Sequence, residues 1–181
     1  MKLLHMVLAG FLCSALQVTT EAQVRLSKEE ALSIQFPGAG VERETTFLTD
    51  EQQHEIQRTS RSKVESKLLT YYVARTQGRL DGVAFFETHT VRTMPATYMV
   101  VIEPDTSVRI VEVLAFHEPA DYRPPERWLK QYRGRTMGDD LYLKRGIPNI
   151  AGATLSAHTI SEGVRRILAS YAVAVAHEVQ R

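Results

Sequence analysis

The sequence predicts an α+β fold: an antiparallel meander sheet packed against a long C-terminal helix, with short N-terminal helices. Three observations predict it. Four β-type segments follow one another between residues 69 and 116. An apolar stripe at helical spacing runs from Ile160 to Val175. Polar segments with helix-capping residues precede both. The composition is globular, and a net charge of +1 gives no reason to expect nucleic acid as a partner.

The first 22 residues are typical of a signal peptide. Lys2 supplies a positive start, an apolar run covers Leu3 to Val18, and Ala22 gives a small residue at the expected cleavage site. We therefore expect export to a periplasmic or membrane-associated location. An uncleaved N-terminal anchor is the alternative. The only cysteine, Cys13, lies in this segment, so the mature chain has no disulfide.

Residues 23–66 are predicted to be an N-terminal helical segment, and residues 67–181 the main domain. Ser27 and Glu30 form a capping-box pattern that starts a short helix before Pro37. A second, polar helix is expected to begin at Thr49-Asp50 and to run to about Ser60.

The predicted sheet has four strands in meander order, because β-branched and aromatic residues alternate between turn signals. Turn residues at Pro104 to Ser107 make the last two strands a hairpin. The four segments are Leu69–Ala74, Gly82–Val91, Tyr98–Ile102 and Val108–Phe116.

Three elements are expected after the sheet. Glu126 to Tyr132 is predicted to be helical with Trp128 in the core, and Leu141 to Leu143 to be a short strand. The longest helix is expected over about Ser156 to Val179. Its apolar stripe and the Tyr98–Phe116 hairpin are predicted to share one core.

Several catalytic and metal-binding classes lack their sequence patterns. The two closest histidines, His158 and His177, are 19 residues apart, so no local zinc motif is present. The chain also has no Gly-x-Ser-x-Gly elbow and no Gly-x-Gly-x-x-Gly loop. No acid–base pair supports a reductase that turns over a small substrate, so we expect no bond-making catalysis of its own.

The segment Gly152-Ala153-Thr154-Leu155 opens the long helix. Glycine permits backbone conformations that other residues resist, and Ala153 keeps the neighbourhood small. Thr154 places a hydroxyl near a helix N-terminus, where unpaired N–H groups favour phosphate. The plain alternative is that Gly152 ends the preceding element and that Thr154 or Ser156 only caps the helix.

In context, this segment resembles the FMN-binding domain family of Rnf and sodium-translocating NADH:quinone reductase complexes. The family motif is Asp-x-x-Ser/Thr-Gly-Ala-Thr, whose threonine carries FMN through a phosphodiester bond. Gly152, Ala153 and Thr154 match it, whereas Pro148 and Ala151 occupy the Asp and Ser/Thr positions. The similarity covers roughly residues 69 to 170. It implies that a separate metal-dependent flavin transferase attaches FMN to Thr154.

The resemblance also implies a role for Glu118-Pro119, which the family places near the isoalloxazine ring. Glu118 is expected to contact the ring or to shape the loop, the alternative being an exposed carboxylate at a strand end. Tyr122 is a candidate for stacking on the flavin. His158 either faces Thr154 or is an exposed first-turn histidine. Arg165 and Arg166 are interpreted as solvated.

The expected function is an exported flavoprotein that carries FMN, with Gly152, Ala153, Thr154, Leu155, Glu118 and Pro119 as the cofactor-binding residues. It would relay electrons between membrane or periplasmic redox partners. FMN held without the covalent bond is a variant of this hypothesis. The alternative is a flavin-free periplasmic α+β module that recognises a protein partner or a small ligand, with the Gly-Ala-Thr loop only starting a helix.

Overall fold

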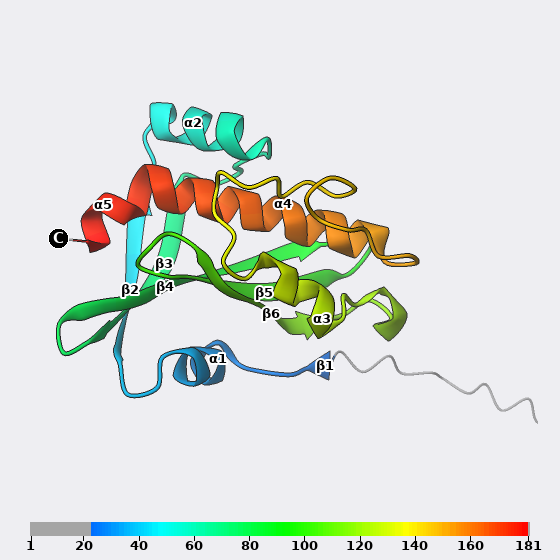
Figure 1. The fold of residues 1–181 in the computed structure, drawn as a ribbon, viewed down its shortest axis with the longest axis horizontal. Coiled ribbons are helices and arrows are strands. Elements are labelled where there is room, and N and C mark those ends of the chain that lie inside the picture. Colours follow the sequence, from blue (N-terminus) through cyan, green and yellow to red (C-terminus); the bar gives the residue numbers. More distant parts are fainter. Residues whose placement is uncertain (1–22, 181) are drawn as a thin grey trace, which may run out of the picture.

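The computed structural model describes residues 23–180 and confirms the α+β class. Its centre is one antiparallel sheet with the strand order β1-β6-β5-β4-β3-β2 (Figure 1). Strands β2 to β6 form the meander, and β1 closes the far edge beside β6. The elements are β1 (Gln23–Val24), α1 (Lys28–Gln35), β2 (Gly40–Phe47), α2 (Asp50–Ser60), β3 (Leu68–Thr76), β4 (Arg79–Thr90), β5 (Pro95–Ile102), β6 (Val108–Phe116), the 3₁₀ turn η1 (Ala120–Tyr122), α3 (Glu126–Leu129), the 3₁₀ turn η2 (Lys130–Tyr132), α4 (Thr154–Ser170), the π-helical segment η3 (Tyr171–Val175) and α5 (Ala176–Val179).

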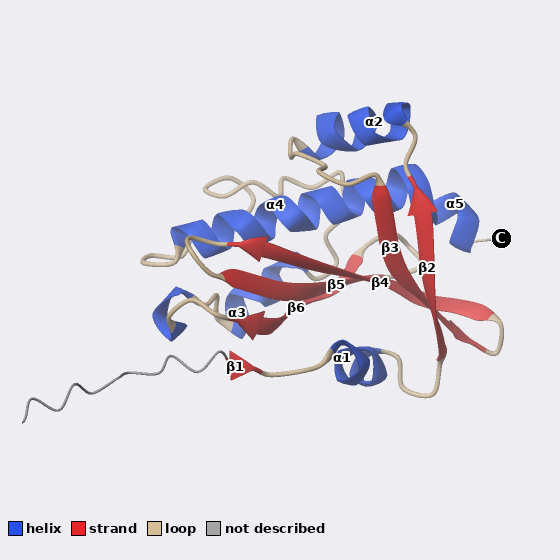
Figure 2. Cartoon of the chain, turned by 180° about the vertical axis from the view of Figure 1, so that it is seen from behind, coloured by secondary structure: helices blue, strands red, loops and turns tan. Residues whose placement is uncertain are grey.

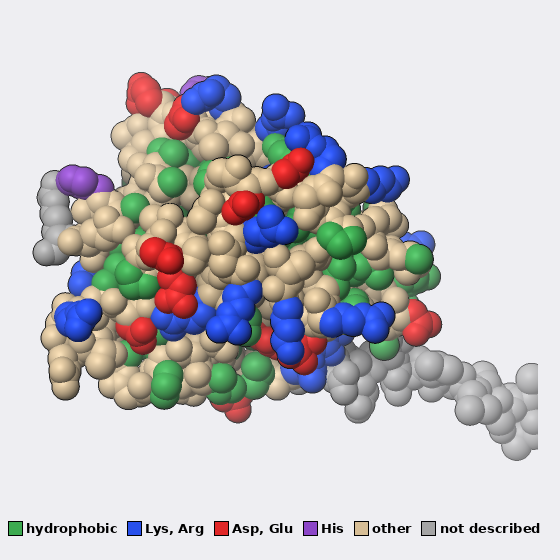
Figure 3. All heavy atoms as spheres, viewed as in Figure 1, with side chains coloured by type: hydrophobic (Ala, Val, Ile, Leu, Met, Phe, Trp, Pro, Cys, Tyr) green, Lys and Arg blue, Asp and Glu red, His purple; other side chains and the backbone are tan. Residues whose placement is uncertain are grey.

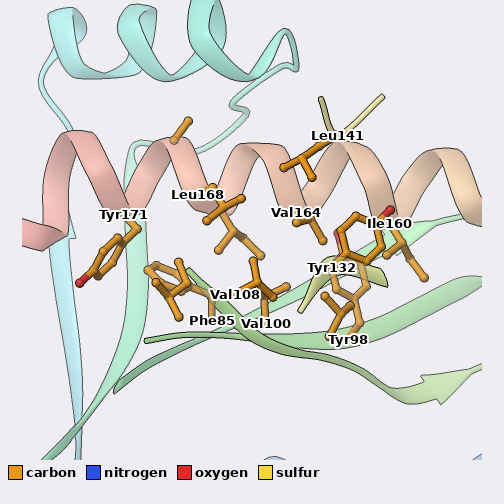
Figure 4. Packing of buried hydrophobic residues seen from close by; sticks show 14 of the residues in the cluster. Phe85, Tyr98, Val100, Val108, Tyr132, Leu141, Ile160, Val164, Leu168 and Tyr171 are labelled. Atoms are coloured by element: carbon orange, nitrogen blue, oxygen red, sulfur yellow. The ribbon is translucent and has the colours of Figure 1, made fainter. Parts of the chain in front are cut away.

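Helix α4 lies across one face of the sheet, as predicted (Figures 1 and 4). Its stripe residues Ile160, Val164 and Leu168 are at most 2% exposed and belong to the same core cluster as Phe85 and Val100 of the sheet. Burying each such side chain stabilises the fold by about 1.5–3 kcal/mol. The helix begins at Thr154, two residues before the predicted start, and continues through η3 to the predicted end at Val179.

The opposite face of the sheet is covered by α1 (Figure 1). Leu32 and Phe36 pack there against Ala84, Met99 and Val101 in a second core cluster. Alternate residues of a strand point to opposite faces. Val101 therefore faces α1. Its chain neighbours Val100 and Ile102 face α4 and share the core with that helix. The hairpin thus contributes to two cores and not to the single core that was predicted.

The two short helices begin where the capping patterns place them. The Ser27 hydroxyl accepts from the backbone N–H of Glu30, whose carboxylate accepts from the Ser27 N–H. Thr49 and Gln52 repeat this arrangement at the start of α2. These local hydrogen bonds satisfy N–H groups that a helix cannot pair internally.

The segment 23–66 is more than helical, because it also supplies both edge strands. Strand β2 pairs with β3 from Gly40↔Arg75 to Phe47↔Leu68, and β1 pairs with β6. Most of β2 is exposed, so it lacks the alternation that identifies a half-buried strand. The predicted Leu141–Leu143 strand is wrong: only an isolated bridge joins Leu143 to Ile147.

The predicted signal peptide, residues 1–22, lies outside the described residues. Among residues 23–180, no helix has the length and apolar character that crossing a membrane requires.

Charged side chains of both signs are interspersed on the face shown in Figure 3.

Candidate functional site

The predicted site lies at the N-terminus of α4. Gly152 has φ +82°, the left-handed conformation that glycine adopts without strain. This turn brings the chain into α4, with Ala153 as the buried N-cap and Thr154 as the first helical residue. No side chain in the described residues caps the helix, so its first N–H groups lack internal partners. The hydroxyl of Thr154 is on an exposed residue beside these donors.

The Thr154 hydroxyl has local partners that sequence reasoning missed. The Asn149 side-chain amide donates to Thr154 Oγ1 at 3.0 Å, and the carbonyl of Ile150 lies 3.4 Å from the same oxygen. The other side-chain atom of Asn149, Oδ1, is buried without a hydrogen-bond partner in the described part of the chain. A buried polar atom without a partner is uncommon.

A shallow pocket of about 200 Å³ borders Thr154. Residues 152–156 form one side, and Arg92 and Tyr122 form the other. The Arg92 guanidinium carbon lies 4.7 Å from the Tyr122 ring centroid, a cation–π distance. The structure therefore brings a cation and an aromatic ring to the hydroxyl. No sequence motif identifies Arg92 as a site residue, because only the tertiary fold brings it close to Thr154.

Glu118 supports this pocket from behind and does not line it. Its side chain is buried, and its Oε1 accepts from the backbone N–H groups of Arg92 (3.0 Å), Thr93 (2.7 Å) and Met94 (2.9 Å). The hydrogen bonds from Thr93, Met94 and Arg92 hold the pKa of the Glu118 carboxyl below its ordinary value. Of the sequence-based alternatives for Glu118, this geometry corresponds to shaping the loop.

Pro119 and Leu155 occupy different places around the pocket. Pro119 is exposed and precedes η1, where its carbonyl accepts from the Tyr122 N–H at 2.9 Å. It thus helps to position the Tyr122 ring. Leu155 lines the pocket and is 51% exposed, an unusual setting for a large apolar side chain.

The loop before the site is anchored to the core by Trp128. The indole Nε1 donates to the carbonyl of Pro148 at 2.7 Å, and the ring is buried, as predicted. Pro148 and Ala151, the two positions that depart from the family motif, are both exposed. Their side chains are therefore accessible from solvent.

His158 does not reach the Thr154 hydroxyl. Its Nε2 lies 3.5 Å from the Glu162 carboxylate, one turn farther along α4, and its side chain is 62% exposed. Of the two sequence-based alternatives for His158, the structure corresponds to the exposed first-turn histidine. Among residues 23–180, no base is positioned at the Thr154 hydroxyl, and a threonine hydroxyl without one is a weak nucleophile.

The interpretation of Arg165 and Arg166 as solvated is wrong. Arg165 is 4% exposed, and its guanidinium donates to the carbonyls of Ser60 and Leu141. It also lies 4.2 Å from the ring centroid of Tyr142. Burial lowers the pKa of Arg165. The paired arginines cannot both face solvent, because α2 and the 141–142 loop cover this side of α4.

Arg166 belongs to a partly buried polar cluster that sequence reasoning missed. Its Nε donates to Glu87 Oε1 at 3.1 Å, and the Tyr98 hydroxyl donates to Glu87 Oε2 at 2.9 Å. A His89 ring nitrogen lies 2.8 Å from the same carboxylate. Burial raises the pKa of Glu87, but the hydrogen bonds from His89 and Arg166 outweigh it and hold that pKa below its ordinary value. The only sequence signal was Glu87 and His89 at alternate positions of one strand.

Residues 23–180 contain no group of three or more metal-ligating side chains placed to hold an ion. No model of a known protein family matches the chain, and no curated protein does. Its function is therefore inferred from the motif and from the geometry of the site.

Proposed function

We propose that this chain is an exported electron-transfer flavoprotein that carries FMN in a phosphodiester bond to Thr154. The observation that carries the proposal is the exposed Thr154 hydroxyl at the uncapped start of α4, beside the positive-φ turn at Gly152. A helix N-terminus favours a phosphate through its free N–H groups and its dipole.

The residues present fit this cofactor chemically. Arg92 supplies a cation for the phosphate or for the anionic reduced flavin, and Tyr122 supplies an aromatic face. Leu155 offers an exposed apolar surface. Nothing in the structure lies within 4 Å of where a Cβ on Gly152 would stand, so this side of the turn is open.

Bound FMN would supply one- and two-electron transfer, while the protein sets its position and potential. Thr154 anchors the phosphate, and a covalent tether prevents loss of the cofactor outside the cytoplasm by making recapture intramolecular. Glu118 holds the 91–94 loop, and with it Arg92, in place.

Attachment requires a separate enzyme, because the hydroxyl has no base of its own. A metal-dependent flavin transferase would use FAD as donor. The Thr154 oxygen would attack the phosphorus of the FMN half, the pyrophosphate bond would break, and AMP would leave with the hydroxyl proton taken up by solvent. Membrane or periplasmic redox proteins would then be the electron donor and acceptor.

The test is co-expression with a flavin transferase, followed by denaturation and intact-mass measurement. We expect a gain of one FMN minus one water for the parent and none for Thr154→Val, which keeps shape but lacks the oxygen. Thr93→Val, another exposed threonine near the pocket, is the matched control and should label like the parent.

Equal labelling of Thr154→Val would show that another residue accepts FMN, and Ser156 would be the first to test. An unlabelled parent that still copurifies with released FMN would indicate noncovalent binding. An unlabelled, colourless parent would refute the flavin function and favour the flavin-free module.

A further inference from the structure

The sheet divides between β3 and β4, and a cleft of about 320 Å³ lies in the opening. Pairing of these strands starts only at Tyr72↔Ala84. Residues 68–71 of β3 pair with β2 alone, and residues 85–90 of β4 pair with β5 alone. In Figure 2, β3 rises away from β4 beyond this point. Two strand edges without a strand partner therefore border one cleft.

Parts of these two edges have no hydrogen-bond partner from a neighbouring strand. At Leu68 the Ser66 hydroxyl takes that place: it accepts from the Leu68 N–H at 3.0 Å and donates to the Leu68 carbonyl at 3.4 Å. Every strand residue has a backbone N–H and C=O, and those that point away from the paired neighbour require another partner or water. The residues that line the cleft include both unpaired stretches, 68–70 and 85–89. Its walls thus offer the pattern that an extended backbone recognises.

The side chains around the cleft add an apolar wall. Phe85 and Ile167 are nearly fully buried on the side of α4, while Leu68 lies at the mouth with 47% exposure. Val64, from the loop after α2, closes the cleft from above. The apolar surface that a ligand can reach is therefore mainly that of Leu68 and of the half-buried Leu69.

The charged groups of the cleft are already paired with one another. Arg166 binds Glu87 through two nitrogens and also faces Glu162 at 3.8 Å. Lys63 lies 3.4 Å from Glu65. A ligand recognised by net charge would have to compete with these pairs. An uncharged extended backbone could bind without competing with these ion pairs.

We propose that this cleft binds an extended peptide segment of a partner protein by strand addition between β3 and β4. The peptide backbone pairs with residues 68–71 on one side, where it displaces the Ser66 hydroxyl from Leu68, and with residues 85–90 on the other. An apolar side chain of the peptide packs against Leu68 at the mouth. The site is separate from the Thr154 pocket and is independent of the proposed flavin function.

The probe is an acetylated, amidated peptide of sequence Ser-Thr-Val-Thr-Val-Ser, titrated into ¹⁵N-labelled, flavin-free protein. We expect amide shift changes confined to residues 68–71, 85–90 and their contacts. The matched probe has N-methyl groups on alternate residues, which removes the hydrogen bonds to one wall and keeps the side chains. It should bind about tenfold more weakly or worse.

Leu68→Lys should weaken binding by about fivefold or more, since it places a cation on the apolar mouth. Ile34→Lys is the matched control: Ile34 is 59% exposed on α1, which covers the opposite face. Both variants should keep the parent's melting temperature. Equal binding of the N-methylated peptide would show apolar capture without strand addition and would overturn the proposal. Shift changes elsewhere, or none at about millimolar peptide, would overturn it as well.

Discussion

Gly163 lies where α4 meets the Tyr98 side chain of β5, and we predict that Gly163→Ala destabilises the fold. A Cβ at this position would stand 1.6 Å from the Tyr98 hydroxyl oxygen and 2.8 Å from Glu87 Oε2. Real Cβ contacts essentially never fall below 3.0 Å. The Tyr98 ring must therefore retreat by more than an ångström, or α4 must lift from the sheet.

The expected cost follows from three contributions. Alanine in place of glycine favours a helix by about 1 kcal/mol. Overpacking a core costs about 1–3 kcal/mol, and losing the buried Tyr98–Glu87 hydrogen bond costs a further 1–3 kcal/mol or so. The net is a loss of about 3 kcal/mol, which corresponds to about 6–12 °C in Tm for a domain of this size.

Urea denaturation of the parent, both single variants and the double variant with Tyr98→Phe measures this contribution. Removing the hydroxyl relieves the nearest contact, although ring carbon Cζ is still 2.8 Å from the new methyl. Gly163→Ala should thus cost at least about 1 kcal/mol less in the Tyr98→Phe background. A Gly163→Ala protein as stable as the parent would refute the close packing of α4 on β5.

Three further predictions concern the cores on the two faces of the sheet, the 91–94 loop and the Glu87 carboxylate. Leu168→Asp and Val101→Asp should each lower the free energy of unfolding by several kcal/mol, because both sites are at most 2% exposed and offer no partner for a carboxylate; parent-like urea midpoints would contradict this. Glu118→Ala should speed amide hydrogen exchange at residues 92–94 and reduce FMN attachment, and unchanged exchange would show that the carboxylate does not hold the loop. Because the pKa of Glu87 is lowered in the folded state, its contribution to stability is present above its ordinary pKa of 4.5 and is lost as pH falls through the folded value. Stability should therefore decline less steeply in acid for Glu87→Gln than for the parent, and identical acid profiles would be inconsistent with the cluster.

The sequence by itself determined the features that depend on residues close together in the chain. The starts of α1 and α2 follow from Ser27 and Thr49, whose hydroxyls act within three residues of their own position. The strands with alternating apolar residues were predictable, since each buries one face or both. The turn at Gly152 was predictable for the same reason, because a positive φ is a property of one residue.

Tertiary structure decided which distant residues lie beside Thr154. Arg92 and Tyr122 are far from Thr154 in the sequence, and Glu118 binds a loop 24 to 26 residues earlier. No spacing rule predicts such contacts, because they depend on how β4, β5 and η1 end at one corner. Phosphate attraction at a helix start was a local prediction, and Tyr122 was already a candidate for stacking on the flavin, whereas the cation Arg92 beside them was not predicted.

The burial of the two arginines and the split in the sheet were likewise beyond sequence reasoning. A charged pair on a helix is normally solvated. Here Arg165 is covered by the end of α2, and Arg166 meets Glu87 from another element. Strand β2 was missed because, at an edge with most residues exposed, backbone pairing with β3 holds it in place, and pairing leaves no pattern in side-chain hydrophobicity. The sequence therefore specified the helix caps, the central strands and the turn before Thr154, while long-range packing decided which charged groups are buried and where the sheet opens.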